Sequence, residues 1–214
     1  ATLFMLLQGL LHVLLARLSG DRELVTGTVV AGRRHADLEA VIGMFVNTLA
    51  VKTRPIPGKP LTRFMEEVKE ITLNAFENQE YPFEELVEKI GVVRDSSRNP
   101  IFDVMFTMQE DPAANPQKTQ QNRDDENKKR QTKFAGEPVA GNDFPVSKFD
   151  ITFVAMDKGG DLSFVFQYCT ELFRRETVER FARYFKRILL AAVQDPDVPI
   201  GDIDIMSDEE RRRV

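Results

Sequence analysis

The spacing of apolar residues predicts three amphipathic or buried helices. Residues 3–18 are apolar almost throughout, with Thr2 in position to cap a helix and Gly20 to end it. Residues 62–77 and 174–194 carry apolar side chains three and four positions apart, which is typical of a helix with one buried face. The expected buried positions are Phe64, Val68, Ile71 and Ala75 in the first of these and Val178, Phe181, Phe185, Ile188, Leu189 and Ala192 in the second.

A period of two predicts strands between these helices. Alternating or β-branched runs occupy residues 24–31, 44–53, 148–156 and 161–168. The last two are separated by Asp-Lys-Gly-Gly, which predicts a hairpin. Gly27 interrupts the first strand and indicates a bulge or a close backbone approach.

Residues 78–109 combine a helix, a turn and a strand. Pro82 suits the first position of a helix, and Gly91 suits its end. We expect the side chains of Phe83, Leu86, Val87 and Ile90 to be buried on this helix. A cluster of short polar residues and Pro100 then predicts a turn, and a strand is predicted from Ile101.

Residues 110–142 are the compositional outlier, rich in Pro, Asn, Gln and mixed charge, and we interpret them as a flexible loop. The remaining elements mix helices with strands in an order that favours an α/β fold. We expect a mixed, partly antiparallel sheet packed by helices.

Bulk composition narrows the function classes. The 214 residues carry a formal net charge of −5, which argues against nucleic acid as a partner. The single Cys excludes an internal disulfide. The apolar opening segment is interrupted by Gln8, His12 and Arg17 and is too short to span a bilayer, so we expect no membrane association.

Self-sufficient catalytic machinery is not visible in the sequence. There is no nucleophile elbow, no phosphate-cradling glycine loop and no metal-ligand spacing, so we predict no metal site. Of the two histidines, His12 lies on the apolar first helix and is expected to be a packed core residue. His35 is expected in an exposed loop beside two arginines.

Two local features favour a binding role. Asn47 shares a predicted strand face with Phe45, Leu49 and Val51, so its amide needs hydrogen-bond partners or a hydrated channel. Arg33 and Arg34 follow a predicted strand end, where forked guanidinium groups hold phosphate well; a solvated turn is the alternative.

Four stretches resemble the C-terminal half of condensation domains from nonribosomal peptide synthetases. They are VIGMFVNT (residues 41–48), NQEYPFEEL (78–86), RDSSRNPIFDVMF (94–106) and KFDITF (148–153). TVVAGRRHADLE (28–39) and the MSDEER tail (206–211) also fit, and the order of the motifs is the family's. The resemblance covers nearly the whole chain.

The resemblance implies a single chloramphenicol-acetyltransferase-like lobe of a two-lobed domain. In that family, carrier proteins deliver aminoacyl or peptidyl thioesters on 4'-phosphopantetheine arms, and an acceptor amine attacks the donor thioester to form an amide. The family's H-H-x-x-x-D-G motif belongs to the N-terminal lobe and is absent from this sequence. We therefore expect residues 1–206 to form the C-terminal lobe, residues 207–214 to start a linker to an adenylation domain, and the chain to hold no catalytic residue and be inactive alone.

Site roles carried over by the resemblance fall into three groups. Met44, Phe45 and Asn47 are expected to line the substrate tunnel, and Arg33 or Arg34 to contact the phosphate of an arriving phosphopantetheine arm. Asp95, Arg98 and Asn99 are expected to brace the tunnel wall. The implied partners are the N-terminal lobe, donor and acceptor carrier proteins and an adenylation domain, in the cytoplasm, with no cofactor bound directly.

The same motifs are compatible with other functions. A condensation-like domain that has lost its chemistry and recruits carriers or tailoring enzymes would carry the same motifs, and so would epimerisation or heterocyclisation relatives. The double-histidine motif of the N-terminal lobe decides between catalysis and recruitment.

Overall fold

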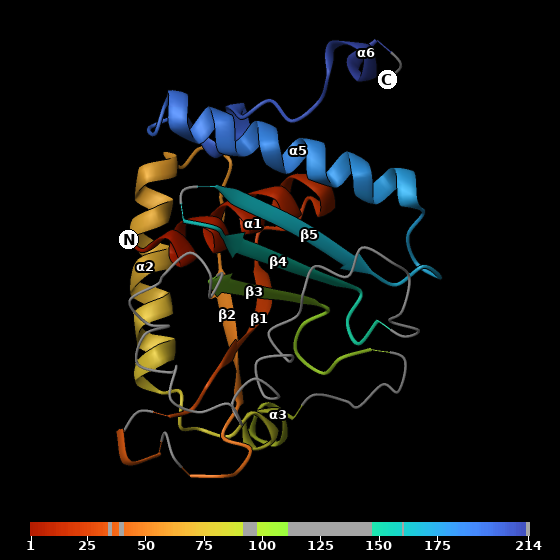
Figure 1. Ribbon diagram of the computed structural model, residues 1–214. Coiled ribbons are helices and arrows are strands. Elements are labelled where there is room, and N and C mark those ends of the chain that lie inside the picture. The colour runs from red at the N-terminus through yellow and green to blue at the C-terminus, as the bar shows by residue number, and fades with distance from the viewer. Residues whose placement is uncertain (34–35, 39–40, 92–97, 111–146, 160, 213–214) are drawn as a thin grey trace.

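The computed structural model of the chain describes residues 1–33, 36–38, 41–91, 98–110, 147–159 and 161–212. Its strands form one five-stranded sheet in the order β2-β1-β3-β4-β5 (Figure 1). The three inner strands are parallel, and each edge strand is antiparallel to its neighbour. The predicted mixed, partly antiparallel sheet is therefore confirmed. The strands are β1 Leu24–Val30, β2 Asn47–Thr53, β3 Val104–Glu110, β4 Ile151–Asp157 and β5 Leu162–Tyr168.

The helices begin and end close to the residues that the sequence predicts. The side chain of Thr2 accepts the backbone N–H of Met5 at 3.3 Å, and Gly20 ends the first helix with φ 78°. The predicted hairpin is confirmed as the β4–β5 pair. The helices are α1 Leu3–Ser19, α2 Leu61–Glu77, α3 Phe83–Ile90, α5 Arg175–Gln194 and α6 Asp208–Arg211, with short 3₁₀ turns η1 Ala36–Leu38 and η5 Ile200–Asp202.

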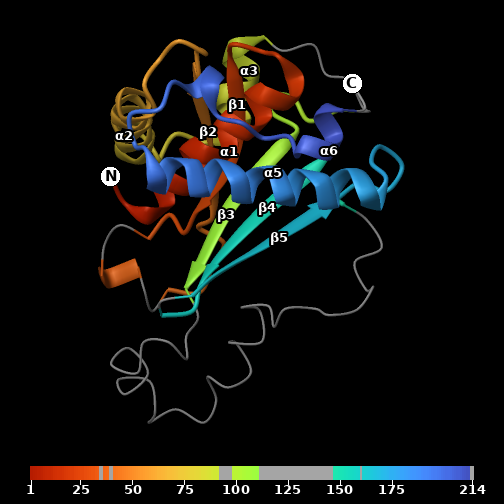
Figure 2. The same ribbon diagram turned by 90° about the horizontal axis from the view of Figure 1, so that it is seen from above.

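The main core lies between the sheet and helices α1, α2 and α5 (Figure 2). Phe153 on β4 is its centre, fully buried and 4.7 Å from the ring of Phe185 on α5 in an edge-to-face arrangement. Phe106, Phe164 and Phe166 from the neighbouring strands also contact Phe153. Such aromatic pairs stabilise the core beyond the apolar area that they bury.

On the face of the sheet away from α1, Gly27 of β1 packs against the ring of Phe102. A Cβ at this position would fall within the ring of Phe102, so only glycine lets the ring pack against β1. Val87 of α3 and Met105 of β3 are also buried outside the main core. The sequence predicted a bulge or a close backbone approach at Gly27; the register with β2 is continuous there, and what approaches Gly27 is the side-chain ring of Phe102.

Two buried hydrogen bonds from His12 join α1 to strands β1 and β2. His12 is fully buried, and its Nε2 lies 2.7 Å from the hydroxyl of Thr26 on β1 while Nδ1 bonds the hydroxyl of Thr53 on β2. A neutral imidazole has one donor and one acceptor, and a hydroxyl can serve either. Complete burial lowers the pKa of His12 to about 3, so the ring is neutral. His12 is a core residue, as predicted.

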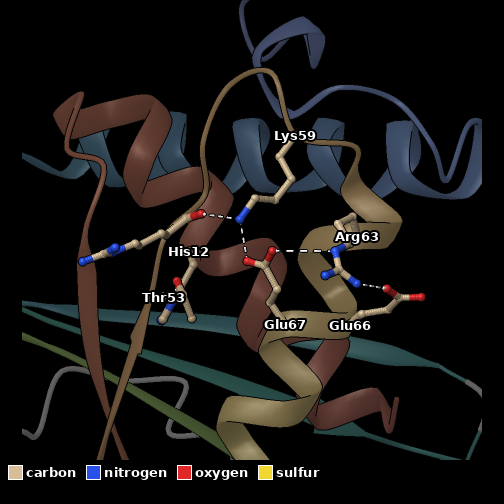
Figure 3. A network of polar contacts seen from close by, with 7 residues as sticks. His12, Thr53, Lys59, Arg63, Glu66 and Glu67 are labelled. Atoms are coloured by element: carbon tan, nitrogen blue, oxygen red, sulfur yellow. Dashed lines mark hydrogen bonds and ion pairs between the residues drawn. The ribbon is translucent and has the colours of Figure 1, made fainter.

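A second network fixes the connection between β2 and α2 (Figure 3). Lys59 donates to the carbonyl of Arg54 at 3.2 Å and pairs with Glu67 on α2 at 2.5 Å. Arg63 in turn contacts Glu66 at 2.9 Å and Glu67 at 4.0 Å. Lys59 therefore ties the connection between β2 and α2 to α2 by a charge-assisted bond.

Some predicted boundaries and burials are wrong, each for a tertiary reason. β2 begins at Asn47 and not at residue 44, because its partner β1 ends at Val30. β3 begins at Val104 and not at Ile101, because the ring of Phe102 turns back onto Gly27. Pro82 is the N-cap of α3 and not its first residue.

Burial on the helices also departs from the prediction at a few positions. Ile90 is 56% exposed, because α3 is short and buries only Val87 fully. On α2, Thr72 is fully buried while Ile71 and Ala75 are only partly so. The predicted flexible loop lies outside the described residues from position 111 onward, as do Arg34, His35 and Asp95.

Candidate functional site

The loop before β2 exposes a row of apolar side chains. Residues 41–46, here called the 41–46 loop, leave Ile42 100% and Met44 93% exposed, with Val41 at 45% and Val46 at 60%. Large apolar side chains in such a run are unusual on a protein surface and mark a contact site. This loop contains the predicted tunnel residues Met44 and Phe45.

Arg33 reaches across from the end of β1 to hold this loop. Its Nη1 donates to the carbonyls of Leu38 and Val41, the latter at 2.9 Å, and its Nη2 donates to the carbonyl of Gly43 at 3.2 Å. The guanidinium also lies over the ring of Phe45, 4.4 Å from its centre. The sequence predicted that Arg33 or Arg34 contacts a phosphate, with a solvated turn as the alternative, and did not indicate these bonds.

Asn47 fixes the chain next to the loop. Its Nδ2 donates to the carbonyls of Gln79 and Tyr81, each at 2.8 Å, and its Oδ1 accepts the N–H groups of Thr48 at 2.8 Å and Phe83 at 3.3 Å. The amide predicted to need partners therefore has four. It joins the edge strand β2 to the segment between α2 and α3 and to the first residue of α3.

Two of the predicted bracing residues, Arg98 and Asn99, contact residues just before β3 and β4. Arg98 forms an ion pair with Asp103, and the side chain of Asn99 donates to the carbonyl of Lys148 at 3.3 Å. Partial burial and the nearby charge of Asp103 raise the pKa of the Asp150 carboxyl, while Arg98 opposes that shift. These contacts tie together the approaches to two neighbouring parallel strands.

Aromatic contacts connect the motifs that the sequence singled out. The ring of Phe83, whose N–H Asn47 accepts, lies 5.6 Å from that of Phe102. Phe102 in turn stacks on Phe149 at 5.7 Å. One residue from each of the four quoted stretches thus belongs to a continuous chain of contacts, although more than 100 positions separate the first from the last.

Within the described residues, a separate shallow groove lies at the opposite end of α2. It has a volume of about 400 Å³, and its lining residues include Ala1, Leu6, Leu61, Met65, Ala192 and Pro196. The groove shares no residue with the 41–46 loop or with the partners of Asn47.

Metal-ligating clusters and membrane-spanning helices are both missing from the part of the chain that the structure describes. No group of three or more His, Cys, Asp or Glu side chains there is arranged to hold a metal ion. No helix there is long and apolar enough to cross a membrane. His12, with both ring nitrogens bonded in the core, is not available for catalysis.

Comparisons with known proteins define the class. The fold is that of a condensation-domain lobe: a four-domain nonribosomal peptide synthetase bound to AMP and glycine matches 98% of this chain with TM-score 0.79 and 27% identity, over 16% of its own length. The X-domain from teicoplanin biosynthesis shares the fold with TM-score 0.75 at 23% identity, covering 96% of this chain and 44% of its own.

Sequence similarity then gives the family. A family model described as condensation domain matches residues 1–214, and the chain belongs to that family. Over its whole length it is 43% identical to gramicidin S synthase 2 from Brevibacillus brevis and 40% identical to tyrocidine synthase 3 from Brevibacillus parabrevis. The chain spans only 4% and 3% of these relatives.

Proposed function

We propose that this chain is the C-terminal lobe of a condensation domain that forms an amide bond between carrier-bound aminoacyl or peptidyl thioesters. Residues 1–206 would form the lobe, and residues 207–214 would begin the linker to an adenylation domain. The comparisons support this, since the chain matches 4% of gramicidin S synthase 2 and 16% of a four-domain nonribosomal peptide synthetase, and therefore corresponds to a small part of a large protein.

The exposed 41–46 loop is the observation that carries the proposal. Ile42 and Met44 project into solvent from a loop held in place by Arg33 and flanked by Asn47. Such a row gains stability when a second surface covers it. The N-terminal lobe is that surface, and the loop between the two lobes would be the floor of the substrate tunnel, lined by Met44, Phe45 and Asn47.

Of Arg33 and Arg34, the two side chains predicted to contact the phosphate of a phosphopantetheine arm, Arg34 would keep that role, because the guanidinium of Arg33 is bonded to carbonyls of the 41–46 loop. Arg98 and Asn99, with Asp95, would brace the tunnel wall, supported by the bonds of Arg98 and Asn99 to Asp103 and Lys148. None of these side chains is proposed to transfer a proton. Proton handling belongs to the H-H-x-x-x-D-G motif of the N-terminal lobe, because positioned acid–base groups are needed to activate the amine.

The test compares this chain alone with a two-lobe domain that includes it. Each is mixed with a donor and an acceptor carrier protein loaded with amino acids, and amide product on the acceptor is measured by mass spectrometry. We expect product only from the two-lobe domain. Product from the single lobe would place catalysis in these residues, and carrier binding without product from an intact two-lobe domain would indicate recruitment.

A further inference from the structure

Arg33 makes all of its described contacts to one segment. Its guanidinium donates to the carbonyls of Leu38, Val41 and Gly43 and lies over the ring of Phe45. Leu38 lies before the 41–46 loop, Val41 begins it and Gly43 lies inside it, so one side chain ties the loop to the segment that precedes it. A planar group with several divergent N–H donors is required for such a set of bonds, and a lysine ammonium cannot reproduce it.

The backbone beside Arg33 also contacts the 41–46 loop. Gly32 has φ 66°, and a Cβ there would overlap the carbonyl of Phe45. The end of β1 and the 41–46 loop therefore lie backbone against backbone. The guanidinium of Arg33 lies over the ring of Phe45, which is half-buried, while Ile42 and Met44 remain exposed.

We infer that Arg33 is the positioning residue of the 41–46 loop and does not serve as the phosphate contact. This inference rests on the proposed function, in which the loop is the tunnel floor. Without the guanidinium, the three carbonyls turn to water and the ring of Phe45 loses its cover. The apolar side chains then have no fixed direction, so the surface offered to the other lobe is lost.

Substitution by lysine separates this role from a phosphate contact. Arg33→Lys keeps a positive charge that can attract a phosphate, but it loses the fork that reaches three carbonyls. Arg34→Ala is the matched comparison, because it removes the neighbouring charge and leaves Arg33 in place.

The experiment uses the two-lobe domain carrying Arg33→Lys, Arg33→Ala or Arg34→Ala. Loop order is measured as the rate of chymotrypsin cleavage after Phe45 and as hydrogen exchange at the amide of Val41, which donates to the carbonyl of Leu38 at 3.2 Å. Exchange at Leu49 and Val51 reports whether the buried part of β2 is intact. Affinity for holo- and apo-carrier protein is measured by fluorescence anisotropy.

We expect both Arg33 variants to raise cleavage and Val41 exchange about tenfold, with β2 protection and the holo-to-apo affinity ratio unchanged. Arg34→Ala should leave loop order unchanged. Wild-type cleavage in Arg33→Lys would overturn the inference, as would loss of the holo-carrier preference in Arg33→Ala without loosening of the loop. Because loop order is read without catalysis, an ordered domain that makes no amide would contradict the proposed function alone.

Discussion

The Oδ1 atom of Asn47 accepts the backbone N–H of Phe83 at 3.3 Å. Phe83 is the first residue of α3, and the N-cap residue Pro82 makes no side-chain cap bond. The first N–H groups of a helix have no partner within the helix, so a side chain from elsewhere must satisfy them. Asn47 on β2 therefore caps a helix that begins 36 positions later.

Replacing Asn47 by alanine should destabilise the fold. Four hydrogen bonds would be lost, and the carbonyls of Gln79 and Tyr81 would lose their donor. We expect the free energy of unfolding to fall by about 2 kcal/mol, since the groups are only partly buried and water replaces some of the bonds. Urea denaturation measures the change. In the two-lobe domain we expect turnover to fall as well, because α3 and the start of β2 lose their common anchor.

Asn78→Ala is the matched control for this prediction. Asn78 ends α2, next to Gln79, whose carbonyl Asn47 binds. Its side chain is also an amide, but it donates to the carbonyl of Asn74 in the preceding turn of α2. Its loss should change stability by less than about 0.5 kcal/mol, as for an exposed surface substitution. Equal effects of the two alanine variants would show that the tertiary bonds of Asn47 carry no stability.

The contact between Gly27 and Phe102 makes a second prediction. A Cβ at position 27 would overlap the ring, so Gly27→Ala must displace Phe102 or β1. We expect a loss of about 2 kcal/mol, in the range measured for overpacked cores. Gly58→Ala is the control, because open space surrounds that position. Adding Phe102→Leu to Gly27→Ala should recover part of the loss, and a neutral Gly27→Ala would mean that the ring is not packed there.

These two examples show what the sequence can and cannot predict. The glycine within a strand and the amide on an apolar face were visible as local anomalies, because each conflicts with its immediate neighbours. Their partners were not visible, since Phe102 and Phe83 lie 75 and 36 positions away and nothing in local spacing selects them. The helices and strands followed from periodicity, whereas strand ends depended on where a partner strand stops.

The 41–46 loop is a case in which the sequence pattern predicted a strand and the structure has a loop. Its alternating apolar residues continue the pattern of β2, so periodicity extended the strand to residue 44. Pairing stops at Asn47 because β1 turns away at Gly32, and the same residues become an exposed loop. A row of apolar side chains looks alike in sequence whether the protein's own core or another lobe covers it.

The neutral state of His12 predicts a dependence of stability on pH. Burial lowers its pKa from 6.5 to about 3 in the folded protein, while the unfolded chain retains the ordinary value. The unfolded state therefore binds more protons between these limits. The contribution of neutral His12 to stability is fully present above pH 6.5 and decreases as the pH falls toward 3, by about 1.4 kcal/mol for each pH unit well inside that window.

His12→Gln tests this dependence because glutamine keeps hydrogen-bonding capacity without titrating. Urea unfolding of both proteins at pH 7.5, 6 and 5 gives the difference in stability at each pH. The variant should be less stable at pH 7.5, and its disadvantage should shrink as the pH falls. Parallel curves would mean that His12 titrates at its ordinary pKa and is not isolated from water.

A final prediction concerns the tail that would begin the linker. The hydroxyl of Tyr184 on α5 donates to Oε1 of Glu210 at 3.2 Å, while Oε2 accepts the N–H of Ser207 at 2.8 Å. The hydroxyl of Ser207 in turn accepts the N–H of Glu210 at 3.2 Å, so Ser207 and Glu210 form a reciprocal capping box that Tyr184 holds against α5.

Tyr184→Phe removes the hydrogen bond from α5 to Glu210 and leaves the other bond from α5 to this end of the chain, from Arg187 to the carbonyl of Met206, in place. We expect tryptic cleavage after Arg211 to become about threefold faster while overall stability changes by less than about 1 kcal/mol, because one partly exposed hydrogen bond is lost. Tyr81→Phe is the matched control, since Tyr81 lies 41% exposed on the far side of the fold and its ring contacts Lys89. Equal cleavage rates in the two variants would show that the capping box of Ser207 and Glu210 keeps its place without the Tyr184 hydroxyl.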